Sequence, residues 1–213
     1  MADLKRLKEC VIKGDSEISE NITGEAIDEG MDPSEILNEG LIAGMDVVGA
    51  RFRDGEMFVP EVLISARAMH AGLALLKPLL AKSGIKSMGK AVMGTVQGDL
   101  HDIGKSLVCM MLEGAGFEVI DLGCDVSADK FISTAKDEGA DIIGLSALLT
   151  TTMPVMKTVV ERLQDEGMSG RVKVLIGGAP VTGSFAEEIG ADGYGRDAAA
   201  AIEETKRLTG LAG

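Results

Sequence analysis

The stretch Gly98-Asp99-Leu100-His101-Asp102-Ile103-Gly104-Lys105 separates two segments with different hydrophobic periods. The apolar run 90–96 before it predicts a β-strand, and an amphipathic helix is predicted from Ile103 onward. His101 is therefore expected at a strand-to-helix turn, with a carboxylate two residues before it and a glycine three residues after it. Open parallel sheets bind their ligands at the carboxyl ends of the strands, so this turn is the first candidate for a binding site.

The chain after this turn alternates between strand-like and helix-like segments. Apolar runs predict further strands at 118–122, 141–146, 172–176 and, more weakly, 192–195, with helices at 103–115, 127–138, 153–167, 182–189 and from 197. Continuous apolar strands are typical of a parallel sheet that helices cover on both faces. Residues 90–213 are therefore predicted to form an α/β domain, a doubly wound, flavodoxin- or Rossmann-like fold with a five-stranded parallel sheet.

The residues before the turn carry helical signals only. Apolar residues at helical spacing predict helices over 4–12, 16–29, 33–53 and 58–80. Asp32 is expected to cap the third helix, with Pro33 at its first position and Glu35 completing a capping box. Four helices with short loops predict that residues 1–84 form a helical bundle. The polar segment 84–89 is the expected domain boundary.

Composition excludes several classes of function. The net charge of −13 argues against nucleic acid, because Lys and Arg supply most of the affinity for phosphates. The three cysteines are widely spaced, which indicates reduced thiols rather than a disulfide frame or a zinc site. The N-terminus lacks the apolar core of a signal peptide, and no apolar run has the length of a membrane span. We therefore expect a cytoplasmic protein that acts without a membrane.

Small and polar residues follow the predicted strands. Ser146 and the threonines 150–152 follow the third strand, and Gly177 and Gly178 follow the fourth. Glycines leave room for a ligand to approach the backbone closely. The predicted sheet edge therefore suits a long ligand rather than a single phosphate.

Asp99-x-His101-x-x-Gly104, Ser146-x-Leu148 and Gly177-Gly178 occur in this order. Together they resemble the three-part signature of the cobalamin-binding domain. The sequence GDLHDIGK resembles its methyl-transferring branch, which includes the cobalamin module of methionine synthase and the corrinoid proteins of methylamine, methanol, glycine betaine and O-demethylase systems. The helical segment also resembles this branch, so the resemblance covers nearly the whole chain.

The resemblance implies a set of roles. His101 would bind the cobalt of cobalamin from below, replacing the dimethylbenzimidazole base, while Asp99 orients its ring. Thr152 would continue this relay, and Ser146 and Thr150 would line the slot for the buried base. The remaining residues that the resemblance places at the cofactor are Gly98, Asp102, Ile103, Gly104, Leu148, Gly177 and Gly178.

The resemblance also gives the bundle a role as a cap over the upper face of the corrin. Phe58 is the favoured cap residue, with Leu63 and Met69 as weaker candidates, although Phe58 could equally pack inside the bundle. The implied function is that of a methyl carrier, a corrinoid subunit that is not a catalyst on its own. Its implied partners are a substrate-specific methyltransferase, an acceptor methyltransferase and a reductive activase.

Three alternatives remain open at the level of the sequence. A cobalamin-binding sensor or regulator without methyl transfer would need an added basic DNA-binding module. A cobalamin-dependent mutase subunit shares the lower motif but is usually joined to a substrate barrel. A phosphoacceptor signalling domain of flavodoxin-like shape would need an acidic cluster at other strand ends and would leave the glycines unexplained.

Overall fold

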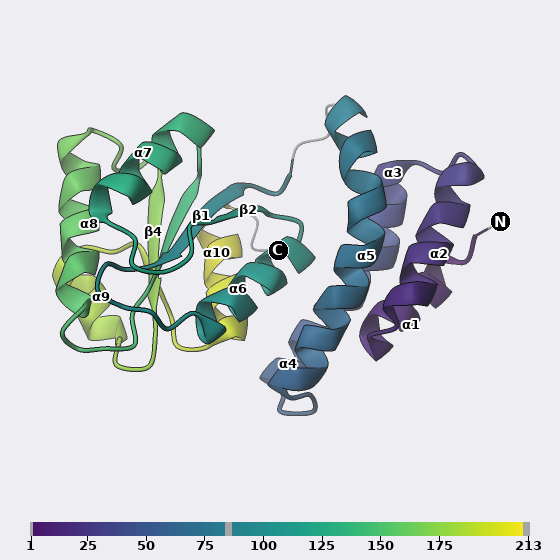
Figure 1. The fold of residues 1–213 in the computed structure, drawn as a ribbon, viewed down its shortest axis with the longest axis horizontal. Coiled ribbons are helices and arrows are strands. Elements are labelled where there is room, and N and C mark those ends of the chain that lie inside the picture. The colour runs from purple at the N-terminus through teal and green to yellow at the C-terminus, as the bar shows by residue number, and fades with distance from the viewer. Residues whose placement is uncertain (1, 84–86, 211–213) are drawn as a thin grey trace. The chain divides into compact units, whose positions relative to one another are not determined.

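The computed structural model describes residues 2–83 and 87–210, which divide into two compact units. The first holds the helices before residue 84 together with Gly114–Gly116, and the second holds the rest of the described chain (Figure 1). The expected boundary segment 84–89 begins with residues 84–86, which lie outside the described residues.

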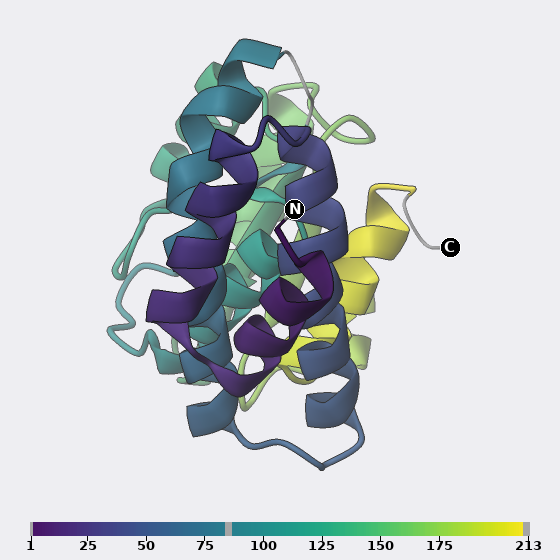
Figure 2. The same cartoon turned by 90° about the vertical axis from the view of Figure 1, so that its right-hand side faces the viewer.

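The helices of the first unit lie side by side in a bundle (Figure 2). They are α1 (Leu4–Lys13), α2 (Ser16–Asp28), α3 (Pro33–Glu35), the π-helix η1 (Ile36–Ile42), α4 (Ala43–Arg53) and α5 (Val59–Ser83). The predicted N-cap Asp32 is confirmed, since its Oδ1 accepts from Ser34 N–H at 2.8 Å. Gly14 ends α1 at a φ of 75°, where a Cβ would lie 2.0 Å from Ile64 Cγ2, so only glycine fits this turn.

The third predicted helix is correct in its ends but not in its interior. Its middle is the π-helix Ile36–Ile42, where the regular 3.6-residue spacing predicted an α-helix. Gly40 lies in this segment, and a Cβ there would come within 2.5 Å of Leu7 Cδ2. The close approach of Leu7 is a tertiary contact, and the local hydrophobic pattern does not report it. Ile36, Gly40 and Leu41 are all buried in this wider turn.

Helix α5 is long and apolar. Contrary to the expectation from the sequence, its segment Val59–Leu80 has the length and composition of a helix that could cross a membrane, and it is the one such segment in the described part of the chain. The core helix of a bundle has the same composition. Val62, Ala66, Met69 and Leu76 are fully buried, and α5 packs along α2, so its apolar character is explained by the bundle.

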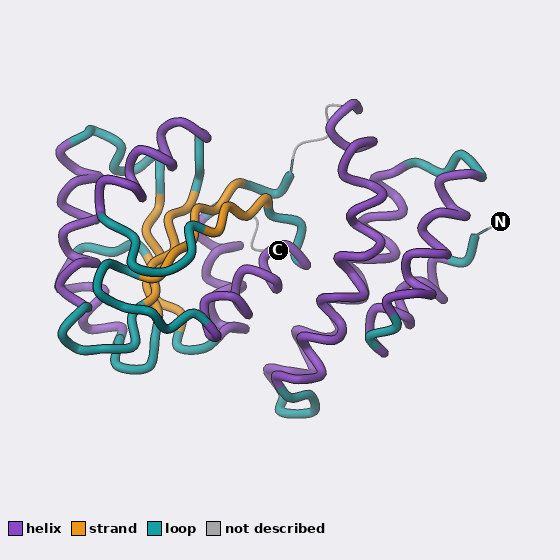
Figure 3. The backbone as a smooth tube through the Cα atoms, in the orientation of Figure 1, coloured by secondary structure: helices purple, strands orange, loops and turns teal. Residues whose placement is uncertain are grey.

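The second unit contains five parallel strands in the order β2-β1-β3-β4-β5. Figure 3 draws the strands in orange. The strands are β1 (Lys90–Thr95), β2 (Glu118–Asp121), β3 (Ile142–Ser146), β4 (Lys173–Gly177) and β5 (Gly193–Gly195). The helices are α6 (Ile103–Gly114), α7 (Ala128–Glu138), α8 (Met153–Asp165), α9 (Gly183–Ile189) and α10 (Ala198–Leu208). The predicted fold class is confirmed. The strand order reverses between β1 and β3, which places the expected ligand site at their carboxyl ends.

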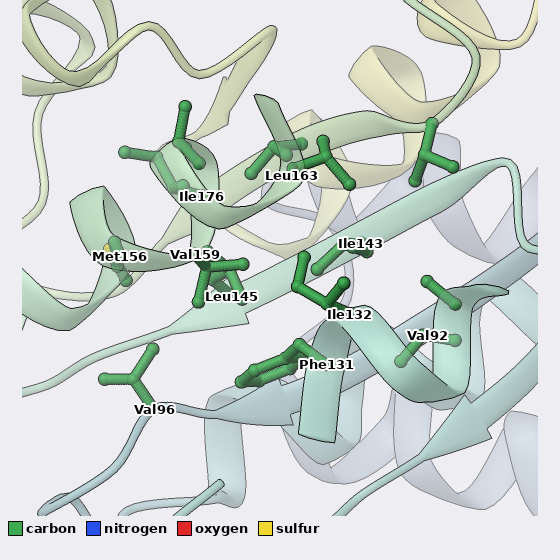
Figure 4. Close-up of a cluster of buried hydrophobic side chains, with 14 of the residues drawn as sticks. Val92, Val96, Phe131, Ile132, Ile143, Leu145, Met156, Val159, Leu163 and Ile176 are labelled. Carbon is green, nitrogen blue, oxygen red and sulfur yellow. The ribbon is translucent and has the colours of Figure 1, made fainter. Parts of the chain in front are cut away.

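Helices cover both faces of the sheet. Helices α7, α8 and α9 lie on one face, and α6 and α10 lie on the other (Figure 1). On the first face, Phe131 of α7 and Met156 of α8 pack with Ile143 and Ile176 of the strands (Figure 4). This packing holds the strands in place. The loops that follow the carboxyl ends of the strands are therefore positioned by the core, and the candidate site lies on them.

Candidate functional site

The loop after β1 holds the carboxylate and the histidine that the sequence singled out. Asp99 is fully buried, whereas the side chain of His101 is 52% exposed. Asp99 Oδ1 lies 2.7 Å from His101 Nδ1 and also accepts from His101 N–H at 3.1 Å. The same carboxylate oxygen therefore fixes both the backbone and the ring of the histidine.

The second oxygen of Asp99 connects this loop to the loop after β3. Asp99 Oδ2 accepts from Leu148 N–H at 2.7 Å, from Leu149 N–H at 3.2 Å and from the Thr152 hydroxyl at 2.9 Å. Thr152 Oγ1 also lies 2.9 Å from the carbonyl oxygen of Leu149. Because the hydroxyl has one proton, it donates to one of these acceptors at a time, and the charged acceptor gives the stronger bond.

Two opposing effects set the pKa of Asp99. Burial alone would raise this pKa, but the N–H of Leu148, the ring and N–H of His101 and the Thr152 hydroxyl outweigh it. The pKa of the carboxyl group is therefore held far below its usual value, and Asp99 is ionised. A carboxylate only accepts hydrogen bonds, so His101 Nδ1 carries the proton. In the neutral ring, Nε2 is then the nitrogen with the free lone pair, as a metal ligand requires.

Large apolar side chains are exposed on the two segments that Asp99 joins. Leu100 and Ile103 flank His101 in the sequence, and Leu148 and Leu149 donate their N–H groups to Asp99; all four expose a large part of their surface. Exposed aliphatic residues that gather around one polar ligand indicate a surface that a flat apolar molecule covers.

A cavity of about 300 Å³ is lined by residues of the sheet and of helices α6 and α10, and neither His101 nor Leu148 is among its lining residues. Its lining includes Gly104 at the start of α6, Ser146 at the end of β3, and the pair Gly177 and Gly178 after β4. A Cβ on Gly104 would meet no heavy atom within 4 Å, and Gly178 has a φ of 131° with no space for a Cβ beside the Ala147 carbonyl. The glycines thus keep the cavity open and allow its wall to turn.

The structure brings most of the predicted site residues together. Asp99, His101 and Thr152 form one hydrogen-bonded chain, as described above. Ile103 and Leu148 lie in the apolar surface around the histidine, and Ser146, Gly104, Gly177 and Gly178 line the cavity. Gly98, with a φ of 85°, forms the turn before Asp99.

Other predicted residues lie apart from these contacts. Thr150 is in an exposed turn and is not among the residues that line the cavity, so its role in the base slot stays a prediction. Asp102 is exposed at the start of α6, where its carbonyl accepts from Ser106 N–H. In the bundle, Phe58 is 68% exposed, which excludes a place in the bundle core, whereas Met69 is fully buried and cannot present its side chain to a ligand.

Sequence reasoning missed a buried ion pair beside the cavity. Lys105 of α6 is buried, lines the cavity and pairs with both carboxylate oxygens of Asp121 at the end of β2. Asp121 Oδ1 also accepts from Gly123 N–H at 2.9 Å. The lysine stands in the quoted stretch, but nothing in the local pattern pairs it with a carboxylate after another strand. Met93, Gly144 and Arg196 also line the cavity. The sequence did not predict them there, because their place in the lining depends on tertiary packing.

Both units match known families. Residues 89–203 match the family described as B12 binding domain, and residues 3–77 match a second family with the same description.

Individual relatives cover most or all of the chain. A corrinoid protein of Desulfitobacterium hafniense is 45% identical over 213 residues, with 99% of each chain covered. Dimethylamine corrinoid protein 1 of Methanosarcina acetivorans is 51% identical over 179 residues, with 84% of each chain covered. Among solved structures, the methanol:cobalamin methyltransferase complex MtaBC of Methanosarcina barkeri is similar with a TM-score of 0.85 and 31% identity, over 96% of this chain and 78% of that chain.

Proposed function

The chain belongs to the corrinoid proteins of methylamine and methanol methyltransferase systems, and we propose that it carries a methyl group on cobalamin with His101 as the lower ligand of cobalt. The observation that carries this assignment is the pair His101 and Asp99. The carboxylate holds the proton of the ring on Nδ1, which leaves Nε2 for a metal, and the ring stands exposed in an apolar surface.

The residues present fit cobalamin in two respects. The aliphatic surface around His101 suits the flat apolar face of a corrin ring. The cavity lined by Gly104, Ser146, Gly177 and Gly178 suits the nucleotide tail with its displaced base. The space that a Cβ on Gly104 would enter is free of protein atoms, so a side chain there would narrow the slot for the tail.

Bound cobalamin supplies a cobalt ion that accepts a methyl group from one enzyme and gives it to another. The chain's own residues hold and orient the cofactor. Asp99 keeps the His101 ring in one rotamer and one tautomer through Oδ1, and its other oxygen ties the ring to the loop after β3. Thr152 donates its hydroxyl proton to Asp99 Oδ2 and so adds a further donor to the ionised carboxylate. The side chains of Leu100, Leu148 and Leu149 would keep water from the lower face of the bound corrin.

We extend the proposal to the bundle, residues 1–84, as a cap domain with Phe58 as the residue that shields the upper face. Phe58 stands exposed immediately before α5, next to the partly exposed Val59. A large exposed aromatic residue in such a patch is typical of a surface that covers a ligand or a partner. The Phe58→Ala variant should therefore lose methyl–cobalt bonds to light several-fold faster than the wild type when the methylated protein is illuminated. Equal photolysis rates would contradict the cap role of Phe58.

The family assignment also identifies the partners. The chain works with methyltransferases, as the relatives named above indicate. We infer in addition that one enzyme loads the methyl group from a substrate, that a second enzyme delivers it to an acceptor, and that a reductive activase restores oxidised cobalt. We place these reactions in the cytoplasm. A sensor without methyl transfer is not favoured, because the relatives serve methyltransferase systems.

Reconstitution with hydroxocobalamin and reduction to Co(II) test the assignment. The wild type should bind one corrinoid per chain, and its paramagnetic resonance spectrum should show coupling to one histidine nitrogen. His101→Ala should lose this coupling and bind at least tenfold more weakly, whereas His70→Gln, which changes the other of the two histidines, should keep it. A wild-type protein that binds no corrinoid would overturn the proposal.

A further inference from the structure

Three successive carbonyls of the histidine loop accept hydrogen bonds from outside that loop. The carbonyl of Asp99 accepts from Asp125 N–H at 3.1 Å, and the carbonyl of Leu100 lies 3.6 Å from Cys124 Sγ. The carbonyl of His101 itself accepts from the Thr95 hydroxyl at 2.8 Å. The donors come from the end of β1 and from the loop after β2, so the backbone of the loop is fixed from two neighbouring elements.

Asp125 contributes to this arrangement twice. Besides its N–H, its Oδ1 accepts from Gly98 N–H at 2.7 Å, which holds the start of the same loop. Among the described residues, Asp125 is the non-glycine residue with a positive φ, at 56°. Such a conformation is unfavourable and persists where the surroundings over-determine it. The two hydrogen bonds to Gly98 and Asp99 supply that constraint.

Thr95 is the second anchor. It is fully buried, and its N–H donates to the carbonyl of Gly123 at 2.9 Å while its hydroxyl reaches His101. The β-branched side chain has a restricted χ1 angle, so the hydroxyl is held toward its acceptor. No atom of Asp99 takes part in this bond, and it is therefore independent of the ring contact at Nδ1.

We propose that Thr95 and Asp125 are positioning residues for the cobalt ligand, which set the height and direction of the His101 backbone while Asp99 sets the rotation of its ring. This inference rests on the proposed function of His101. A metal bond tolerates little displacement of its ligand, so a loop that relaxes by a fraction of an ångström weakens the nitrogen–cobalt contact without unfolding the domain.

The test measures the share of cofactor that His101 ligates in the reconstituted Co(II) protein, from the nitrogen coupling in its paramagnetic resonance spectrum. Thr95→Val keeps the shape of the side chain and removes the donor, so the ratio of histidine-bound to histidine-free cobalt should fall about fivefold, the worth of one hydrogen bond. Thr95→Ser keeps the hydroxyl and should restore most of the ratio.

Substitutions at Asp125 separate the hydrogen bond from the strain. Asp125→Gly relieves the positive φ but removes the acceptor for Gly98, so it should lower the ratio by a similar factor. Asp125→Asn keeps an oxygen acceptor and tolerates this conformation, and it should stay close to the wild type.

Thr23→Val is the matched control. Thr23 is also fully buried and also donates to a backbone carbonyl at 2.8 Å, but it lies in the bundle. The Thr23→Val variant should lose about as much stability as Thr95→Val, and it should leave the nitrogen coupling of the cobalt unchanged. In the cofactor-free protein, Thr95→Val and Asp125→Gly should speed amide exchange at His101 several-fold, which tests the positioning role even where a variant binds cobalamin poorly.

The outcomes distinguish the two claims. A wild type without nitrogen coupling contradicts the role of His101 and the proposed function. A wild type with coupling that Thr95→Val and Asp125→Gly leave unchanged, together with unchanged amide exchange, contradicts only the positioning role.

Discussion

Asp99 accepts hydrogen bonds from two side chains and three backbone N–H groups, and this set makes its charge part of the fold. In the folded state, the pKa of the Asp99 carboxyl group lies far below its ordinary value of 3.8. Ionised Asp99 therefore stabilises the folded chain fully above that ordinary pKa, and the stabilisation is lost as the pH falls below it.

Asp99→Asn should accordingly lower the free energy of unfolding of the cofactor-free protein by about 2–3 kcal/mol at neutral pH. The difference from the wild type should begin to shrink as the pH falls below about 4, because the unfolded chain then takes up a proton that the folded Asp99 does not. Urea unfolding at a series of pH values measures this difference. A gap that stays constant over the range would mean that the charge of Asp99 is not what stabilises the loop.

Among the elements, the ion pair between α6 and β2 joins a buried group to a partly exposed one. Lys105 is buried, whereas the side chain of Asp121 is 38% exposed. Removing the partner of a buried charge is more costly than removing the buried charge itself, because the remaining ion cannot reach water.

Asp121→Asn should therefore destabilise the protein by about 3 kcal/mol, and Lys105→Met by only about 1 kcal/mol. The double variant should be close to Lys105→Met alone. Denaturant unfolding of the three variants provides the measurement, and equal losses for the two single variants would show that Asp121 is as desolvated as its partner.

The elements were predictable from the sequence where local pattern determines them. The five strands and the helices around them follow from apolar runs and glycine breaks, whereas the grouping of Asp99, His101 and Thr152 was implied by the resemblance to the cobalamin-binding family. The π-helix Ile36–Ile42 was not predictable, because it depends on the contact between Gly40 and Leu7. Likewise, the bond from Thr95 to His101 depends on a loop geometry that spacing does not encode.

At the scale of the whole molecule, the chain has two compact units and one proposed cofactor. A ligand that binds only the folded state raises the free energy of unfolding, by about 2.7 kcal/mol at a concentration one hundred times its Kd. Cobalamin should therefore stabilise each unit that it contacts. Calorimetry of the full chain should show the transition of the α/β unit moving upward with added cobalamin. If the bundle also covers the ligand, the transition temperature of the bundle should rise with added cobalamin as well. Phe58→Ala should then reduce the rise of the bundle's transition and leave the rise of the α/β unit's transition unchanged. A scan that cobalamin leaves unchanged would contradict both expectations.

The bonds around the histidine loop have a consequence for how the cofactor is loaded. Every donor and acceptor among them belongs to the chain, so none of these bonds has to be made by a cofactor atom. A preorganised site of this kind avoids the entropy of ordering a loop during association. If His101 is the lower ligand, as proposed above, the rearrangement during loading would lie with the corrinoid rather than with the loop. We therefore expect the association rate to rise with the fraction of corrinoid whose lower position is already free.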